Sequence, residues 1–152
     1  MLKKLMLGLM GALVLGRAGA ADLNWPADFP HALAQAKAEK KWVFLDFTGS
    51  DWCEPCQLLA GKILSRPEFV AYAITNLELV EVDFPMKKSQ PEALKAANKA
   101  LAEKFNVEAY PTLIAVKPDG TVAWRMDGFL PSLLTDGPKA LIAQIEGARK
   151  PN

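Results

Sequence analysis

The chain has 152 residues, of which 51% are apolar, and a formal net charge of +1. This length accommodates one domain with a hydrophobic core, and the apolar content excludes an intrinsically disordered chain. The near balance of charges gives no indication of the basic surface that nucleic-acid binding requires.

The first twenty residues have the composition of an export signal. Lys3-Lys4 supply positive charge, residues 5–15 are apolar with interspersed glycines, and Ala18-Gly19-Ala20 matches a small-residue cleavage site. The apolar run is about half of the roughly 20 residues that span a bilayer, although an uncleaved membrane anchor is the alternative. We therefore expect a signal peptide over 1–20, a mature domain over 21–152, and a periplasmic location. Cleavage would leave 15 basic against 17 acidic residues, a formal charge of −2.

The first half of the mature chain alternates between helical and extended patterns. We expect a helix capped by Asp28 that runs to about Lys40, a buried strand over 42–47, a helix over 57–64, a short helix opened by a Ser65–Glu68 capping box and ending near Ile74, and an alternating strand over 77–84.

The second half predicts one more helix, a hairpin and a final helix. We expect a helix from a Ser89–Glu92 capping box to Phe105, a strand over 112–116, a turn over 117–120, an antiparallel strand over 121–126, and an amphipathic helix over 138–148. This order implies an α/β fold, a three-layer α/β/α sandwich with a mixed central sheet.

The two cysteines of the chain are three residues apart, as Cys53-Glu54-Pro55-Cys56, between an expected strand and an expected helix. That spacing lets one sulfur attack a substrate disulfide while the other resolves the mixed disulfide. A structural crosslink explains the pair poorly, because so short a loop constrains the unfolded chain little.

The sequence assigns the cysteines different roles. Cys53 lies at a helix N-terminus, where unpaired N–H groups and the helix dipole stabilise a thiolate, so it is the expected nucleophile. Cys56 lies one turn further on and is expected to be more buried and to resolve the intermediate. Pro55 suits a first helical turn. Glu54 disfavours the Cys53 thiolate, which favours a more reducing couple and hence a reductase.

Asp46 is a candidate proton acceptor. It lies within an apolar strand, where a carboxylate is costly. Either it ends the strand in solvent, or it is buried below the cysteines with a raised pKa and takes a proton from Cys56 through water. The pattern favours neither alternative.

Trp52, Tyr110 and Pro111 are candidates for contact with the substrate. A cis Pro111 facing the cysteines would leave the backbone of Tyr110 free to pair with an extended substrate strand, although a trans proline that starts a strand is the commoner arrangement. Trp52 either borders the site and excludes water from Cys53, or serves only in packing.

Two other uses of a Cys-x-x-Cys pair do not fit the chain. Covalent haem attachment requires a histidine after the second cysteine, and Gln57 is found there. A zinc site needs about four ligands, whereas the chain offers two thiols and the distant His31. We therefore expect neither a metal nor an organic cofactor.

Several of these motifs together resemble the thioredoxin superfamily over about residues 28–148, and a bacterial exported thioredoxin-like subgroup in particular. They are Asp46-Phe47, Gly49-Ser50-Asp51-Trp52-Cys53, Pro55-Cys56, Val82-Asp83-Phe84-Pro85 and Tyr110-Pro111-Thr112. The resemblance implies Cys53 as nucleophile, Cys56 as resolving thiol, Asp46 as the buried acid and Pro111 as a cis proline. Glu54 stands where the family usually has glycine.

We accordingly expect an exported, monomeric thiol–disulfide oxidoreductase that reduces protein disulfides. A membrane partner that supplies electrons is an implication of the compartment and the family. Two alternatives stay open. The same residues could serve a disulfide oxidant or isomerase, and the groove at Tyr110 could belong to a peptide-binding module with redox-silent cysteines.

Overall fold

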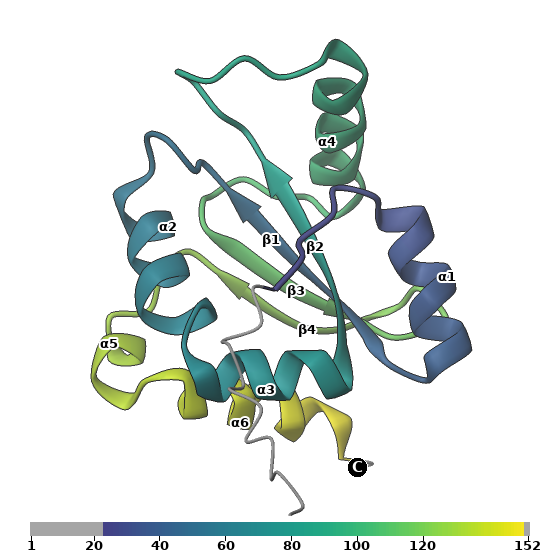
Figure 1. The fold of residues 1–152 in the computed structure, drawn as a ribbon, viewed down its shortest axis with the longest axis vertical. Coiled ribbons are helices and arrows are strands. Elements are labelled where there is room, and N and C mark those ends of the chain that lie inside the picture. Colours follow the sequence, from purple (N-terminus) through teal and green to yellow (C-terminus); the bar gives the residue numbers. More distant parts are fainter. Residues whose placement is uncertain (1–22, 151–152) are drawn as a thin grey trace, which may run out of the picture.

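A sheet of four strands forms the centre of the computed structural model, which describes residues 23–150 (Figure 1). The strands are β1 (Trp42–Thr48), β2 (Leu77–Asp83), β3 (Thr112–Val116) and β4 (Val122–Asp127). Their order across the sheet is β2-β1-β3-β4. The expected signal peptide lies outside the described residues.

The sheet is mixed, as expected. β1 and β2 run parallel and in register, with Asp46 beside Glu81, whereas β1–β3 and β3–β4 are antiparallel. The expected turn joins β3 to β4, and the N–H of Gly120 donates to the carbonyl of Lys117 at 2.9 Å. Gly120 has a φ of +87°, a conformation that glycine adopts without steric cost.

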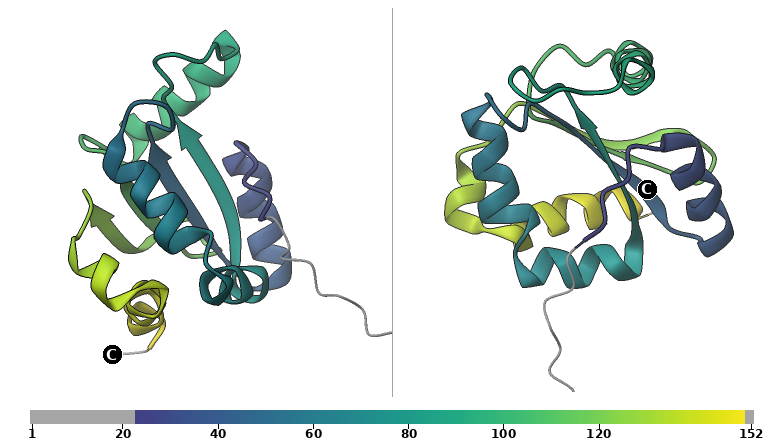
Figure 2. Two further views of the ribbon diagram at one scale, coloured as in Figure 1. Left: turned by 60° about the vertical axis from the view of Figure 1, so that its left-hand side comes forward. Right: turned by 45° about the horizontal axis from the view of Figure 1, so that its top comes forward.

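Helices cover both faces of the sheet (Figure 2). They are α1 (Phe29–Glu39), α2 (Glu54–Leu59), the π-helical segment η1 (Ala60–Leu64), α3 (Pro67–Asn76), α4 (Glu92–Lys104), α5 (Ser132–Asp136) and α6 (Pro138–Arg149). No helix within residues 23–150 combines the length and the apolar content needed to cross a bilayer.

The alternation of side chains along β1 separates two cores. Val43 and Phe47 point to the face covered by α1 and the C-terminal part of α4. Phe44 points to the other face, where it packs with Leu59 of α2 and Phe69 of α3. The three-layer α/β/α prediction is therefore confirmed.

One of the three expected helix caps forms. Asp28 accepts the N–H of His31 at 3.0 Å, as expected. The capping box at Ser65 is wrong, because α3 begins at Pro67 and its cap residue is Arg66, whose backbone is extended (ψ 144°). A residue before proline is disfavoured in the helical region, so the helix cannot start earlier. The Ser65 hydroxyl instead donates to the carbonyl of Gly61 at 3.0 Å.

The capping box at Ser89 is wrong for a related reason. α4 begins at Glu92 and its cap residue is Pro91, which makes no side-chain hydrogen bond to the helix. Gln90, which precedes this proline, is biased toward extended backbone and so cannot belong to a helix opened by Ser89.

The expected helix over 57–64 is interrupted. Its second half is the π-helical η1, in which the N–H of Ser65 donates to the carbonyl of Ala60 at 3.0 Å. The wider turn allows the consecutive residues Ile63 and Leu64 both to be buried. The short helix α5, between β4 and α6, was not expected.

Candidate active site

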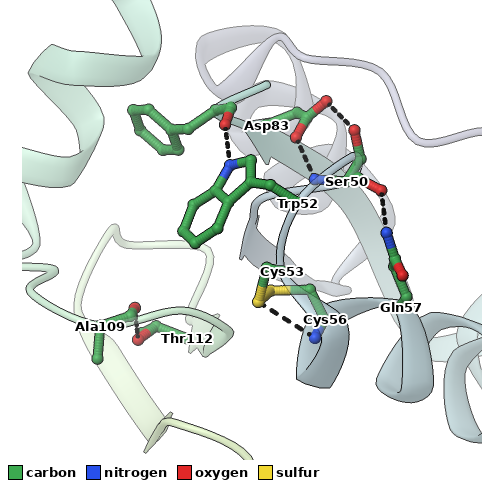
Figure 3. Close-up of a disulfide and its surroundings, with 9 residues drawn as sticks. Ser50, Trp52, Cys53, Cys56, Gln57, Asp83, Ala109 and Thr112 are labelled. Carbon is green, nitrogen blue, oxygen red and sulfur yellow. Dashed lines mark hydrogen bonds between the residues drawn. A yellow bond between two sulfur atoms is a disulfide. The ribbon is translucent and has the colours of Figure 1, made fainter. Parts of the chain in front are cut away.

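The two cysteines form a disulfide at the start of α2 (Figure 3). The S–S distance is 2.17 Å and the Cα atoms are 5.2 Å apart. Cys53 is the cap residue of the helix, and the N–H of Cys56 donates to the Cys53 sulfur at 3.3 Å. The helix thus directs one of its unpaired amide donors at this sulfur, which is the interaction that lowers the pKa of a thiol at such a position.

The expected contrast in burial between the two cysteines is not found. Cys53 is 5% exposed and Cys56 is 3% exposed, so both are almost fully covered when the disulfide is formed. Trp52, the neighbour of Cys53, is 40% exposed. Trp52 therefore presents an exposed aromatic surface beside the disulfide.

Trp52 is held by contacts from two other loops. Its indole N–H donates to the carbonyl of Phe84 at 2.7 Å, and its ring lies edge-on to that of Tyr110, with centroids 5.8 Å apart. The rings of Phe84 and Tyr110 are also in contact, at 5.3 Å. A Cβ atom at Gly49 would lie 2.4 Å from the indole, so only glycine fits there. Gly49 was part of the motif that resembles the family, but its role in making room for Trp52 was not predicted.

The loop before Cys53 is anchored to the end of β2. The N–H and the hydroxyl of Ser50 donate to the carboxylate of Asp83 at 2.9 and 2.6 Å, and Gln57 donates from its side chain to the carbonyl of Ser50 at 3.1 Å (Figure 3). Asp51 accepts three backbone N–H groups from residues 86–88 at 2.8–2.9 Å. The anchors at Ser50 and Asp51 to β2 and residues 86–88 escaped the sequence analysis, because their partners lie more than thirty residues away in the chain.

Asp46 is buried rather than at a solvent-exposed strand end. It is 6% exposed, β1 continues beyond it to Thr48, and its Oδ1 has no partner within the described residues. It shares a face of the sheet with Phe44, which contacts α2, so its carboxyl lies in the layer between the sheet and that helix. Burial raises the pKa of Asp46 to about 7, and the nearby Glu81 and Asp83 add to the shift.

Glu81 forms an acidic cluster with its neighbours. It stands beside Asp46 in the parallel pair β1–β2 and is half-buried. Its pKa is raised by burial and by the charge of Asp83, and Lys88 partly offsets this increase. No cation adjoins Asp46 among the groups that shift its pKa. The C-terminal end of β2 therefore surrounds the buried acid with negative charge.

The peptide bond between Tyr110 and Pro111 is cis. Neither the backbone N–H nor the carbonyl of Tyr110 takes part in a hydrogen bond with another described residue. The following residue, Thr112, is buried, and its hydroxyl donates to the carbonyl of Ala109 at 2.8 Å.

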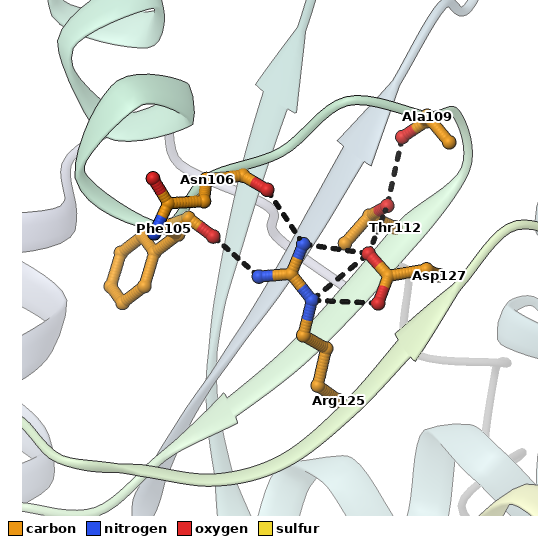
Figure 4. A network of polar contacts seen from close by, with 6 residues as sticks. All are labelled: Phe105, Asn106, Ala109, Thr112, Arg125 and Asp127. Atoms are coloured by element: carbon orange, nitrogen blue, oxygen red, sulfur yellow. Dashed lines mark hydrogen bonds and ion pairs between the residues drawn. The ribbon is translucent and has the colours of Figure 1, made fainter.

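A guanidinium group holds the loop that leads to Tyr110 (Figure 4). Arg125 of β4 donates to the carboxylate of Asp127 and to the carbonyls of Phe105 and Asn106, at the end of α4. Asp127 is also within 3.4 Å of the Thr112 hydroxyl. This network links β4, the end of α4 and the loop in front of β3.

Residues 23–150 contain no candidate metal site. No group of three or more His, Cys, Asp and Glu side chains is arranged there to hold a metal ion. His31 lies in α1, at the backbone position capped by Asp28. The side chains that gather beside Cys53 are the aromatic ones of Trp52, Phe84 and Tyr110.

A mixed sheet between helical layers, with a Cys-x-x-Cys disulfide at a helix N-terminus, defines a thiol–disulfide oxidoreductase. The family model of the thioredoxin-like domain matches residues 29–133. The chain belongs to the thioredoxin superfamily.

Its relatives include proteins of disulfide chemistry. The disulfide bond reductase DsbH of Chlamydia pneumoniae is 37% identical over 131 residues, which cover 86% of this chain and 75% of the relative. The thiol:disulfide interchange protein DsbD 2 of Pseudomonas aeruginosa is 33% identical over 98 residues, covering 64% of this chain but only 15% of that protein.

A solved structure of a DsbH oxidoreductase superposes with a TM-score of 0.76 at 36% identity and covers 85% of each chain. The oxidised C-terminal domain of DsbD from Neisseria meningitidis shares the fold, with a TM-score of 0.55 at 22% identity over 83% of this chain and all of that domain.

Proposed function

We propose that the protein is an exported reductase of protein disulfides in which Cys53 is the nucleophile and Cys56 the resolving thiol. The observation that carries the assignment is the hydrogen bond from the Cys56 N–H to the Cys53 sulfur at the start of α2. When the pair is reduced, this donor and the helix N-terminus favour the thiolate at Cys53 over Cys56. Pro55 occupies the first helical turn without loss of a helical hydrogen bond.

The reaction consists of two exchange steps. The Cys53 thiolate attacks one sulfur of the substrate disulfide, a bond forms between them, and the second substrate sulfur leaves as a thiolate that takes a proton. Cys56 then gives its proton to the carboxylate of Asp46 and attacks Cys53. The Cys53–Cys56 disulfide forms, the first substrate sulfur leaves as a thiolate that takes a proton, and the two electrons of the dithiol have passed to the substrate.

Asp46 is suited to this proton transfer. A base works best when its pKa is close to the working pH, and the pKa of Asp46 is about 7. Its unpartnered Oδ1 lies in the layer beneath α2, the helix that carries Cys56.

Electrostatics support the reductive direction. Glu54 adjoins Cys53 in the chain, and Asp46 lies in the layer beneath the helix that carries Cys56, so negative charge on these carboxylates disfavours a thiolate and therefore the reduced form. A couple whose reduced form is less stable is the stronger reductant. The name of the Chlamydia pneumoniae relative, a disulfide bond reductase, points the same way.

The substrate is proposed to bind as an extended segment along Tyr110. The free N–H and C=O of that residue could pair with a peptide backbone, and Trp52 would cover the mixed disulfide from the adjoining side. Pro111, which follows Tyr110, would lie beneath the bound segment. The composition of residues 1–20 supports export, and a membrane reductase is the proposed electron donor.

Insulin reduction tests the assignment of the cysteines. We expect turnover in the wild type, none in Cys53→Ser, and a stable mixed disulfide with substrates in Cys56→Ala. Turnover in Cys53→Ser would refute the nucleophile assignment, and wild-type protein that binds peptides without exchange would favour a redox-silent binding module.

The reduction potential tests the direction. We expect a value of about −270 mV, typical of reducing members of this fold. A value of about −120 mV, typical of strong oxidants, would reverse the proposed direction. Rapid alkylation of Cys53 at neutral pH, compared with that of Cys56, measures how far its thiolate is stabilised.

A further inference from the structure

The segment between α4 and β3, residues 106–111, carries the backbone at which the substrate is proposed to bind. It contains no helix or strand, and Glu108 and Ala109 in its middle are exposed. A short exposed stretch without regular secondary structure is ordered by its individual hydrogen bonds. Several of those that hold this segment come from β4 and from the residue that follows it.

Arg125 of β4 binds the first end of the segment. Its Nη1 donates to the carbonyl of Phe105, and its Nη2 donates to the carbonyl of Asn106 at 3.0 Å (Figure 4). Because α4 ends at Lys104, these two carbonyls lie beyond the hydrogen-bond ladder of the helix. The helix dipole also favours a cation at this end. The guanidinium therefore fixes the path of the chain where it leaves α4.

The same guanidinium reaches the second end of the segment through Asp127. Its Nε and Nη2 donate to the Asp127 carboxylate at 2.8 and 2.6 Å. Asp127 stands opposite Thr112 in the β3–β4 pair. The next residue, Gly128, donates its N–H to the carbonyl of Pro111 at 2.8 Å. One side chain thus ties the start of the segment to the strand end that holds Pro111.

The carbonyls on either side of Tyr110 are already bound within the protein. The Thr112 hydroxyl donates to the carbonyl of Ala109 at 2.8 Å, and Pro111 is held by Gly128. The N–H and the carbonyl of Tyr110 itself have no partner among the described residues. Ordering a mobile loop on binding costs free energy, so a segment that is held beforehand binds a peptide backbone more tightly.

We propose that Arg125 is a positioning residue for peptide substrates, a role that rests on the proposed function. It holds the Tyr110 backbone in the geometry that pairs with an extended chain, and so favours disulfides within polypeptides over small disulfides. Its three nitrogens donate to two carbonyls and a carboxylate, which the single ammonium nitrogen of lysine does not reproduce. Only 28% of this side chain is exposed, so water competes weakly for these bonds.

The test compares two substrates in single turnovers of the pre-reduced protein. One is a short blocked peptide whose central cysteine is disulfide-linked to mercaptoethanol, and the other is hydroxyethyl disulfide, which has no backbone amide. In Arg125→Met, the ratio of the second-order rate constants, peptide over small disulfide, should fall about tenfold, the loss expected when one or two backbone hydrogen bonds are weakened. Arg125→Lys should change the ratio in the same direction.

Arg149→Met is the matched control. It removes a guanidinium that donates to the carbonyl of Asn76 at 2.9 Å and stacks on Trp42, at the start of β1. Since β1 runs from there toward the loop that carries the cysteines, this arginine lies at the other end of the strand. The control should retain the wild-type ratio.

Each other outcome overturns the inference. An unchanged ratio in Arg125→Met would mean that peptide binding does not depend on this network. An equal loss on both substrates would mean that Arg125 only supports the fold. A wild-type ratio in Arg125→Lys would show that positive charge suffices without the planar fork. Because lysine keeps the charge and much of the methylene stem, this variant carries the test where Arg125→Met fails to fold.

The order of the segment is measured without any reaction. In the oxidised protein, the backbone order parameters of residues 108–110 should fall in Arg125→Met from about 0.85, typical of rigid backbone, to about 0.6, and stay unchanged in Arg149→Met. Unchanged order at Tyr110 would overturn the positioning role even if neither substrate is reduced. Loss of order in Arg125→Met, together with a wild type that reduces neither substrate, would refute the proposed function while confirming that Arg125 positions Tyr110.

Discussion

Replacing Asp46 with asparagine should change the pH dependence of stability in a defined way. The Asp46 carboxyl has a pKa of about 7 in the folded protein, against 3.8 for an ordinary aspartate. Between these values the unfolded chain releases its proton while the folded chain keeps it, so the free energy of unfolding of the wild type falls as pH rises. At about 1.36 kcal/mol per pH unit, this loss reaches about 4 kcal/mol by pH 7 and stays constant above it.

The asparagine variant cannot ionise at this position and lacks the loss. Urea unfolding of both oxidised proteins between about pH 4 and pH 8.5 should show the variant gaining about 4 kcal/mol relative to the wild type over this range. Glu68→Gln removes one exposed carboxylate and controls for net charge. A difference between Asp46→Asn and wild type that does not change with pH would refute the reasoning, because Asp46 would then ionise alike in both states.

Two substitutions test how the loop before the disulfide is held. Gly49→Ala should lower the free energy of unfolding by about 1–3 kcal/mol, because the new methyl group would lie 2.4 Å from the indole of Trp52. Gly61→Ala, with no atom within 4 Å, should not destabilise, and equal losses in urea unfolding would contradict the steric argument. Asp51→Asn should accelerate hydrogen exchange at the amides of 86–88, which donate to that carboxylate. Unchanged exchange there would show that these bonds do not hold the loop.

Local patterns predicted most of the elements. The buried strand β1 and the alternating strand β2 were found to within one residue at either end, because hydrophobic period is a property of a short segment. The cap at Asp28 was also predicted correctly, because it depends on a hydrogen bond to His31, only three residues away in the chain. The placement of Cys53 at a helix start followed from the boundary between the apolar strand and the helical pattern.

Some predictions failed or left two alternatives open. The features concerned depend on residues distant in sequence, or on a second local preference that opposes the first. Burial of Asp46 depends on coverage by α2 and pairing with β2, neither of which the alternation along β1 specifies. The bond of Ser50 to Asp83 spans 33 residues. At Ser65 the capping pattern was present, but the extended backbone required before Pro67 prevailed.

The π-helical segment η1 determines how the cysteine pair is rotated about the axis of α2. Each residue of an α-helix rotates the chain by about 100° about the axis, so the additional residue in the wide turn of η1 offsets α2 by roughly that angle from the helix that would otherwise continue to Leu64. A deletion within Ala60–Leu64 would restore a regular helix. This regular helix could not keep both ends in place. Either the disulfide would turn away from Trp52, or one of the two adjacent buried side chains, Ile63 or Leu64, would become exposed. The orientation of the redox pair thus depends on the segment that follows its helix, which is joined to the pair where the N–H of Ala60 donates to the carbonyl of Cys56.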